Sequence, residues 1–230
     1  MPSESRRSAH SHARVGDPVI GGRRSRWFCG LAAVSSLMLL TGCGSPGTGP
    51  REGKIASSMG ALIEEALSGE MSDWDRAVLE RARETGQISH ADYLEGVGLY
   101  EDCMAAAGIP LVRTDHPNGL VELQPGAVPA GDDGDEQLLR TNHECMSETY
   151  GTTQDLYGFQ RGNPDLLRDS AEVVVRCLAD AGVIDDQFDR DDFQARVLDD
   201  FSPERLPFDI MDAQVQSCLY GAGMSFLVVE

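Results

Sequence analysis

The six cysteines are the residues whose spacing most constrains the chemistry of this 230-residue chain. Two of them, Cys29 and Cys43, lie near the N-terminus, and four follow at positions 103, 145, 177 and 218. None belongs to a Cys-x-x-Cys pair, so the spacing supports neither thioredoxin-like redox chemistry nor a zinc ribbon. An even set of four cysteines is typical of two disulfides in an exported protein, and four cysteines allow three different pairings.

The histidines add little further chemistry. Three of them, His90, His116 and His143, follow residue 43. None forms a His-Glu-x-x-His or His-x-x-x-His pattern, and the chain has no Gly-x-Ser-x-Gly, so common hydrolase signatures are absent. We expect His143 on the inner stripe of its helix, with its polar atoms satisfied at an interface. We expect His90 at the surface, in the first turn of a helix.

Carboxylates are abundant, with 38 Asp and Glu against 19 Lys and Arg. Clustered carboxylates suit calcium, and paired carboxylates suit glycoside hydrolysis. Neither acidic run fits the calcium loop of an EF-hand, both flank predicted helix starts where acids are favoured, and aromatic residues make up only 6% of the chain. We therefore expect no metal or other cofactor, with a weak calcium-binding module and a carboxylate-dependent envelope hydrolase as alternatives. The two runs comprise Asp132, Asp133, Asp135 and Glu136, and Asp185, Asp186, Asp189, Asp191 and Asp192.

The N-terminal region has the layout of an export signal. Arg23, Arg24 and Arg26 precede an uncharged, mostly apolar run over 27–40. That run is shorter than the roughly 20 residues of an ordinary membrane-spanning helix. The long basic region leaves both general secretion and twin-arginine export open.

The apolar run ends in Leu40-Thr41-Gly42-Cys43, which resembles the lipobox of bacterial lipoprotein precursors. In that family the chain is cut before the cysteine, which is then acylated. The resemblance implies that 1–42 is a removable signal peptide and that Cys43 becomes the lipidated N-terminus. Two or more acyl chains on one residue anchor a protein stably to a membrane. An uncleaved anchor and a plain secretory signal with an unrelated cysteine are the alternatives.

Composition predicts how the remainder relates to the membrane. Segment 43–54 is rich in Gly and Pro, as is typical of a flexible tether. The net charge of the whole chain, −19 at pH 7, becomes more negative once the Arg-rich segment 1–42 is removed. Such a charge argues against binding to nucleic acid and against electrostatic binding to anionic lipid. We therefore expect contact with the membrane through the lipid on Cys43, and an envelope protein or cell-wall component as a possible partner.

The rest of the chain is predicted to be a series of helices. The signals are helical periodicity, Ser or Asn at the expected N-caps and Gly at the expected ends. Between 112 and 134 the pattern predicts a loop with one short strand over 120–123. The polar-aromatic segment 152–162 is predicted to be a connector, Asn163-Pro164 to start a helix, and the tail 226–230 to form an edge strand. The predicted helices cover 55–67, 72–85, 89–108, 135–150, 163–182, 191–201 and 209–220.

Three cysteines share one local pattern, Cys followed by Met or Leu and by Gly five positions after the Cys: CMAAAG at 103, CLADAG at 177 and CLYGAG at 218. The apolar stripes that precede Cys103 and Cys177 also superpose, which predicts an internal duplication. The pairing that makes each unit self-contained is Cys103–Cys145 with Cys177–Cys218. Each bridge closes a loop of roughly 40 residues, which the chain-entropy account values at about 4 kcal/mol.

The stretch TGQISHADYLEGVGLYEDCMAAAGI, over 85–109, resembles a pattern in uncharacterised actinobacterial secreted and lipoprotein-type sequences. The shared feature is a Tyr-x-x-Cys-Met/Leu helix, here Tyr100, Cys103 and Met104. The resemblance covers about a tenth of the chain and implies location and fold, with no known activity.

The sequence thus predicts a mainly α fold, a helical bundle of two duplicated, disulfide-stapled helical units after a signal peptide and a flexible tether. We expect an extracytoplasmic protein of the bacterial cell envelope, anchored to the cell membrane by lipid, that binds or interacts without catalytic activity. The predicted divisions are signal peptide 1–42, lipidated Cys43 and tether 43–54, N-terminal helices 55–87, unit one 88–151, connector 152–162 and unit two 163–230.

Overall fold

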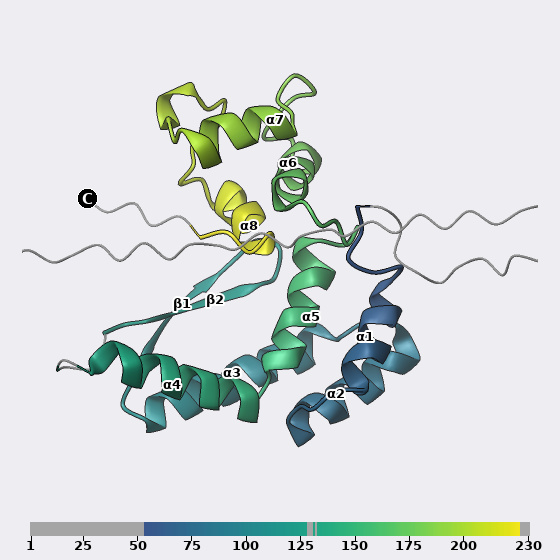
Figure 1. Ribbon diagram of the computed structural model, residues 1–230, viewed down its shortest axis with the longest axis vertical. Coiled ribbons are helices and arrows are strands. Elements are labelled where there is room, and N and C mark those ends of the chain that lie inside the picture. The colour runs from purple at the N-terminus through teal and green to yellow at the C-terminus, as the bar shows by residue number, and fades with distance from the viewer. Residues whose placement is uncertain (1–52, 128–130, 132, 226–230) are drawn as a thin grey trace, which may run out of the picture. The chain divides into compact units, whose positions relative to one another are not determined.

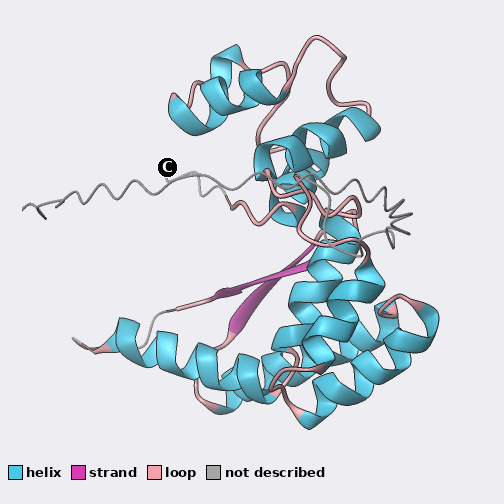
Figure 2. Cartoon of the chain, turned by 45° about the vertical axis from the view of Figure 1, so that its right-hand side comes forward, coloured by secondary structure: helices cyan, strands magenta, loops and turns pink. Residues whose placement is uncertain are grey.

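The computed structural model describes residues 53–127, 131 and 133–225; the signal region, Cys43 and the tail 226–230 lie outside these ranges. Within them the fold is mainly helical, as predicted, with a single two-stranded sheet (Figures 1 and 2). The elements are α1 Met59–Leu67, α2 Asp73–Thr85, α3 His90–Ala106, β1 Leu111–Asp115, β2 Val121–Pro125, α4 Gly134–Glu148, α5 Gly151–Gly162, α6 Ser170–Asp180, α7 Arg190–Phe193 and α8 Ala213–Gly221. A π-helical segment, Gln194–Asp199, continues α7, and a 3-10 turn covers Pro203–Arg205.

Serine side chains begin the first three helices. The hydroxyl oxygen of Ser72 accepts a hydrogen bond from the amide of Asp75 at 2.9 Å, and that of Ser89 accepts one from the amide of Asp92 at 3.0 Å. Helices were predicted to begin at residues 72 and 89, and both starts are confirmed. Such a cap satisfies one of the amides that the first helical turn leaves without a partner.

The repeated cysteine pattern is a repeated helix ending. In α3 the amide of Ile109 donates to the carbonyl of Met104 at 2.9 Å, across Gly108 with φ 81°. Val183 to Leu178 in α6 and Met224 to Leu219 in α8 make the same bond at 2.9 Å. This is the Schellman ending, in which a left-handed glycine lets the chain reverse and satisfies the last carbonyls. It explains why glycine lies four residues after the Met or Leu whose carbonyl accepts the bond. These apolar side chains are themselves fully buried.

Both disulfides have the predicted pairing. Cys103–Cys145 joins α3 to α4 with an S–S distance of 2.04 Å, and Cys177–Cys218 joins α6 to α8 with 2.00 Å. A helix–disulfide–helix arrangement therefore occurs twice. The segments between the paired helices differ, because the first is the β1–β2 hairpin and the second is α7 with its π-helical extension. A common origin by duplication stays a prediction.

The buried side chains form two clusters. The larger draws on α1, α2, α3, the hairpin and α5, with Tyr93, Met104 and Tyr150 among its fully buried members. The smaller lies between α6, α7 and α8 around Val174, Leu178 and Phe193. Tyr220 from α8 packs against the larger cluster, so the second disulfide-linked pair is not self-contained.

Segment 152–162 is helical, whereas the sequence predicted a connector. Helix α5 contains the whole segment and packs against α1, α2, α3, α4 and α8 (Figure 1). Its start has no side-chain cap of its own. Instead the carboxylate of Asp75, in α2, accepts hydrogen bonds from the amides of Thr152 at 3.2 Å and Thr153 at 2.9 Å. A distant residue thus satisfies the start of the central helix, and no local signal marks it.

Asn163-Pro164 does not begin a helix, and this prediction is wrong. The Asn163 side chain bonds to both the amide and the carbonyl of Leu167, at 2.9 and 2.8 Å, and so closes a loop. Helix α6 starts at Ser170, where Asp169 is the N-cap. The sequence also predicted one short strand over 120–123, but two antiparallel strands form, with Leu111 opposite Pro125 and Asp115 opposite Val121.

Candidate ligand-binding cavity

A cavity of about 330 Å³ lies along one face of α5, and we call it the α5 cavity. Its wall combines that face with the ends of α6 and α8, the hairpin turn and the segment before α1, so it is bordered by both core clusters. A volume of this size is at the lower end of the range for small-molecule sites. The lining residues are Ile55, Tyr93, Leu120, Gln154, Asp155, Gly158, Phe159, Asn163, Leu167, Arg168, Ser170, Val173, Tyr220, Gly221, Ala222 and Gly223.

Two glycines set how α5 and α8 approach each other at the edge of this cavity. A β-carbon at Gly162 would overlap the carbonyl oxygen of Gly221, and one at Gly221 would lie 2.8 Å from the Gly162 α-carbon. The two backbones are therefore in direct contact, which only glycine permits. By contrast, a β-carbon at Gly158 would meet no atom within 4 Å, because that position faces open space.

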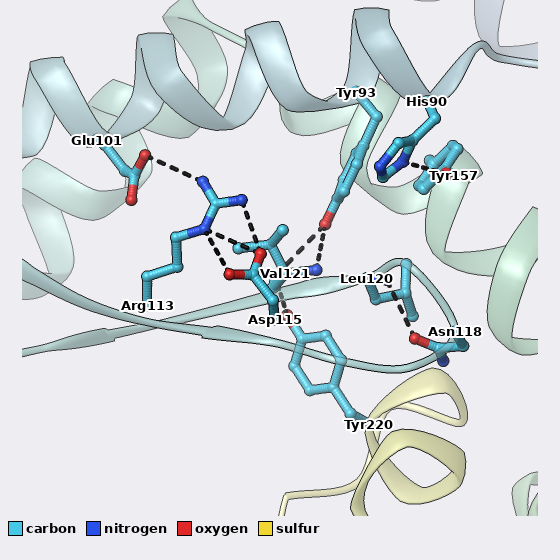
Figure 3. A network of polar contacts seen from close by, with 10 residues as sticks. All are labelled: His90, Tyr93, Glu101, Arg113, Asp115, Asn118, Leu120, Val121, Tyr157 and Tyr220. Atoms are coloured by element: carbon cyan, nitrogen blue, oxygen red, sulfur yellow. Dashed lines mark hydrogen bonds and ion pairs between the residues drawn. The ribbon is translucent and has the colours of Figure 1, made fainter. Parts of the chain in front are cut away.

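A hydroxyl-centred network holds one wall of the cavity (Figure 3). The backbone amide of Val121 donates to the Tyr93 hydroxyl at 2.9 Å, and the Tyr220 hydroxyl donates to the Val121 carbonyl at 3.0 Å. Burial raises the pKa of both phenols above the ordinary value. They therefore stay protonated at neutral pH and act here as hydrogen-bonding groups that join α3 and α8 to the hairpin.

The hairpin turn also binds α8 directly. The amide of Asn118 donates to the Ser217 hydroxyl at 3.2 Å, and its side-chain amide donates to the Ser217 carbonyl at 3.0 Å. Buried His116 stacks on the Tyr220 ring with centroids 4.7 Å apart, and its Nε2 lies 3.0 Å from a Glu122 carboxylate oxygen. These contacts fix the position of the Tyr220 ring beside the cavity.

Asp155 is the one carboxylate among the lining residues of the α5 cavity. Burial of the carboxyl group, with a further contribution from the charge of Asp75, raises its pKa above the ordinary value. The residue as a whole stays exposed, so solvent screens much of the effect of this shift on stability. Next to it, Gln154 Oε1 is buried and has no hydrogen-bond partner within the described ranges.

A second cavity, of about 500 Å³, shares Asp155 with the α5 cavity. Its wall includes Glu70, Asp75 and Asp155 as well as His143. The hydrolase alternative needs a pair of carboxylates in one hollow, and this wall holds three. Asp75, however, is 1% exposed and uses its oxygens to cap α5, so its geometry is explained by the fold.

The structure places the three histidines in three different environments. His143 was expected on an inner stripe, but it is exposed and borders the second cavity, because α4 packs through Cys145 and its neighbours instead. His90 is exposed, as predicted, and its Nδ1 lies 2.9 Å from the Tyr157 hydroxyl. The third, His116, is buried in the contact between the hairpin and α8, a role the sequence did not indicate.

No group of three or more His, Cys, Asp or Glu side chains within the described ranges is placed to hold a metal ion. The second acidic run is used in local structure: Asp189 caps α7 through the amides of Asp191 and Asp192, and Asp192 pairs with Arg196 at 2.5 Å. In the first run Asp133 precedes α4, Asp135 and Glu136 lie in its first turn, and Asp132 lies outside the described residues. The described part of the chain gives the calcium alternative no site.

Comparisons with known proteins leave the family open. No protein-family model matches the chain, and no significant match was found among curated proteins or solved structures. The described helices include none that is long and apolar enough to cross a membrane. The two disulfides point to an oxidising, extracytoplasmic compartment.

Proposed function

We propose that this protein is a lipid-anchored, extracytoplasmic component of a bacterial cell envelope and that its folded body is a binding module. Two observations together support the proposal. The sequence Leu40-Thr41-Gly42-Cys43 follows an apolar run of the export type, and both predicted disulfides are formed in the folded part of the chain that comes after it. Disulfides persist in oxidising compartments, and an acylated Cys43 would hold the body at the membrane surface.

The binding role is supported by the α5 cavity. It combines apolar walls with a few polar groups, as small-molecule sites commonly do. The acidic surface makes adhesion to nucleic acid or anionic lipid unfavourable, so the body would face soluble or wall-bound partners while the lipid holds the membrane.

Two matched variants of the full chain test the anchor. C43A removes the proposed site of lipid attachment. C29A is the control, because Cys29 lies in the apolar run of the signal peptide, which the mature protein would lack. We expect wild type and C29A to incorporate labelled fatty acid and to fractionate with membranes, and C43A to do neither. Label retained in C43A, or lost in C29A, would overturn the proposed anchor.

A carboxylate-dependent envelope hydrolase is the second candidate, because Glu70 and Asp155 border one cavity, although Asp75 beside them caps α5. It predicts that the purified full chain releases reducing ends from wall glycan and that D155N abolishes this release without unfolding the protein. Absence of any release by the folded wild-type protein removes this candidate.

A further inference from the structure

Within the proposed binding role, the structure points to the chemical class of the ligand. We propose that the α5 cavity binds a small organic molecule with a primary ammonium group, which contacts Asp155 and Gln154 while its apolar body lies over Gly158. This inference rests on the proposed function and adds the ligand's charge, its orientation and the residues that hold it.

The charge of the ligand follows from Asp155. This carboxylate lines the cavity and forms no ion pair with any residue that the structure describes. An organic cation would supply the missing partner, and a charge-assisted hydrogen bond is stronger than a neutral one. The negative net charge of the chain, −19, also favours the approach of cations over anions.

The one cationic side chain in the lining, Arg168, belongs to another part of the wall. Its Nε donates to the carbonyl of Lys54 at 3.0 Å, which orients the guanidinium toward the segment before α1. Arg168 follows the end of α5, whereas Asp155 lies eight residues before Asn163, about 12 Å back along the helix axis. The Arg168 guanidinium is thus held by the segment before α1, and Asp155 is left to pair with a cation from the ligand.

The hydrogen-bonding character of the ligand follows from Gln154. Its buried Oε1 accepts no hydrogen bond within the described ranges, and a buried acceptor without a partner is costly. The terminal torsion of a glutamine is soft, so the amide can turn toward the cavity without losing a bond that Oε1 makes. A primary ammonium has three donors, enough to serve the Gln154 oxygen and the Asp155 carboxylate together, which a quaternary ammonium cannot do.

The apolar body follows from the walls and from Gly158. Side chains of Leu120, Phe159 and Leu167 line the cavity, and the rings of Tyr93 and Tyr220 border it. Because a β-carbon at Gly158 would meet nothing within 4 Å, that position leaves room above the middle of α5. Glycine inside a helix costs roughly 0.5–1 kcal/mol relative to alanine, so its presence here is not explained by helix stability.

The test uses the full chain and 2-phenylethylamine, an aromatic primary amine smaller than the cavity, measured by calorimetry at neutral pH. Its neutral match is 2-phenylethanol, and its anionic match is 3-phenylpropanoate. We expect the amine to bind at least ten times more tightly than either match. D155N should weaken amine binding about tenfold, because it removes the charge and keeps the shape.

Two glycine variants locate the site. G158L fills the open position on α5 and should abolish binding. G98L is the matched control, because Gly98 is also a mid-helix glycine with nothing within 4 Å of an added β-carbon but lies outside the cavity lining. Thermal unfolding of each variant checks that it folds, and D155N gives an independent test if G158L does not.

Each outcome decides a different point. Equal affinity for the amine and the alcohol would overturn the ammonium assignment, and so would an unchanged affinity of D155N for the amine. If G158L still blocks these ligands, the α5 cavity remains their binding site. Amine binding that survives in folded G158L places the site elsewhere and overturns the proposal. The absence of saturable binding at millimolar amine overturns it as well, while the lipid-labelling result for Cys43 stands independently.

Discussion

The backbone of Gly162 lies directly against that of Gly221, so the last turn of α5 and the last turn of α8 touch without an intervening side chain. This contact joins a residue of the predicted connector to the end of the second disulfide-linked pair. It brings the two core clusters together beside the α5 cavity.

The first prediction concerns this contact. G162A places a methyl group on the Gly221 carbonyl, and relief requires the two helix backbones to move apart. We expect a loss of about 2 kcal/mol in the free energy of unfolding, typical of overpacking. G158A is the control, since its β-carbon meets open space, and it should be neutral or stabilising. Urea unfolding of both variants checks this, and equal stability of G162A and wild type would contradict the contact.

The second prediction concerns the cap on α5. D75A removes the acceptor of the Thr152 and Thr153 amides and leaves them buried in part, so we expect a loss of about 1–3 kcal/mol. D73A is the matched control in the same first turn of α2, because Asp73 is exposed. Chemical unfolding and amide exchange at Thr153 measure the effect. If D75A and D73A behave alike, Asp75 does not cap α5.

The third prediction concerns the disulfides. The two bridges span 42 and 41 residues, so the chain-entropy account assigns them nearly equal effects. We expect the double variants C103A/C145A and C177A/C218A each to lose about 2–4 kcal/mol in denaturant unfolding. An unchanged midpoint for either variant would show that its bridge constrains little of the unfolded chain.

The fourth prediction concerns pH. The folded pKa of Asp155 lies above its unfolded value, mainly through burial, so the ionised carboxylate destabilises the folded state relative to the unfolded one. This penalty is fully present above the folded pKa and is lost as pH falls toward 3.8, the ordinary pKa of an aspartic acid side chain. We expect D155N to be more stable than wild type at pH 7 and to lose that advantage on acidification. The two unfolding curves, compared at pH 7 and near pH 3.5, check this; an advantage of D155N that is independent of pH would contradict it.

The sequence was sufficient where the determinants are local. Ser72 and Ser89 begin helices because their side chains cap amides three residues later, and Gly108 and Gly182 end them because the chain must turn left-handed there. The disulfide pairing followed from the repeated spacing around the cysteines, and the structure confirms it.

The sequence failed where distant residues decide. Helix α5 contains three glycines, at 151, 158 and 162, and lacks a cap of its own. The residue that caps it, Asp75, lies 77 positions before Thr152 and 78 before Thr153. Asn163 bonds Leu167 rather than starting a helix, which local preference alone does not reveal. The α5 cavity likewise is lined by residues from five separate parts of the chain, so no local sequence motif predicts it.

Intact-mass analysis of the membrane-fraction protein, followed by peptide mapping, measures the proposed lipid on Cys43 and both disulfides in one sample. We expect a chain that begins at a diacylated or triacylated Cys43 and carries both the Cys103–Cys145 and Cys177–Cys218 bridges. An unmodified Cys43, or a chain that retains residues 1–42, would contradict the proposed lipid anchor.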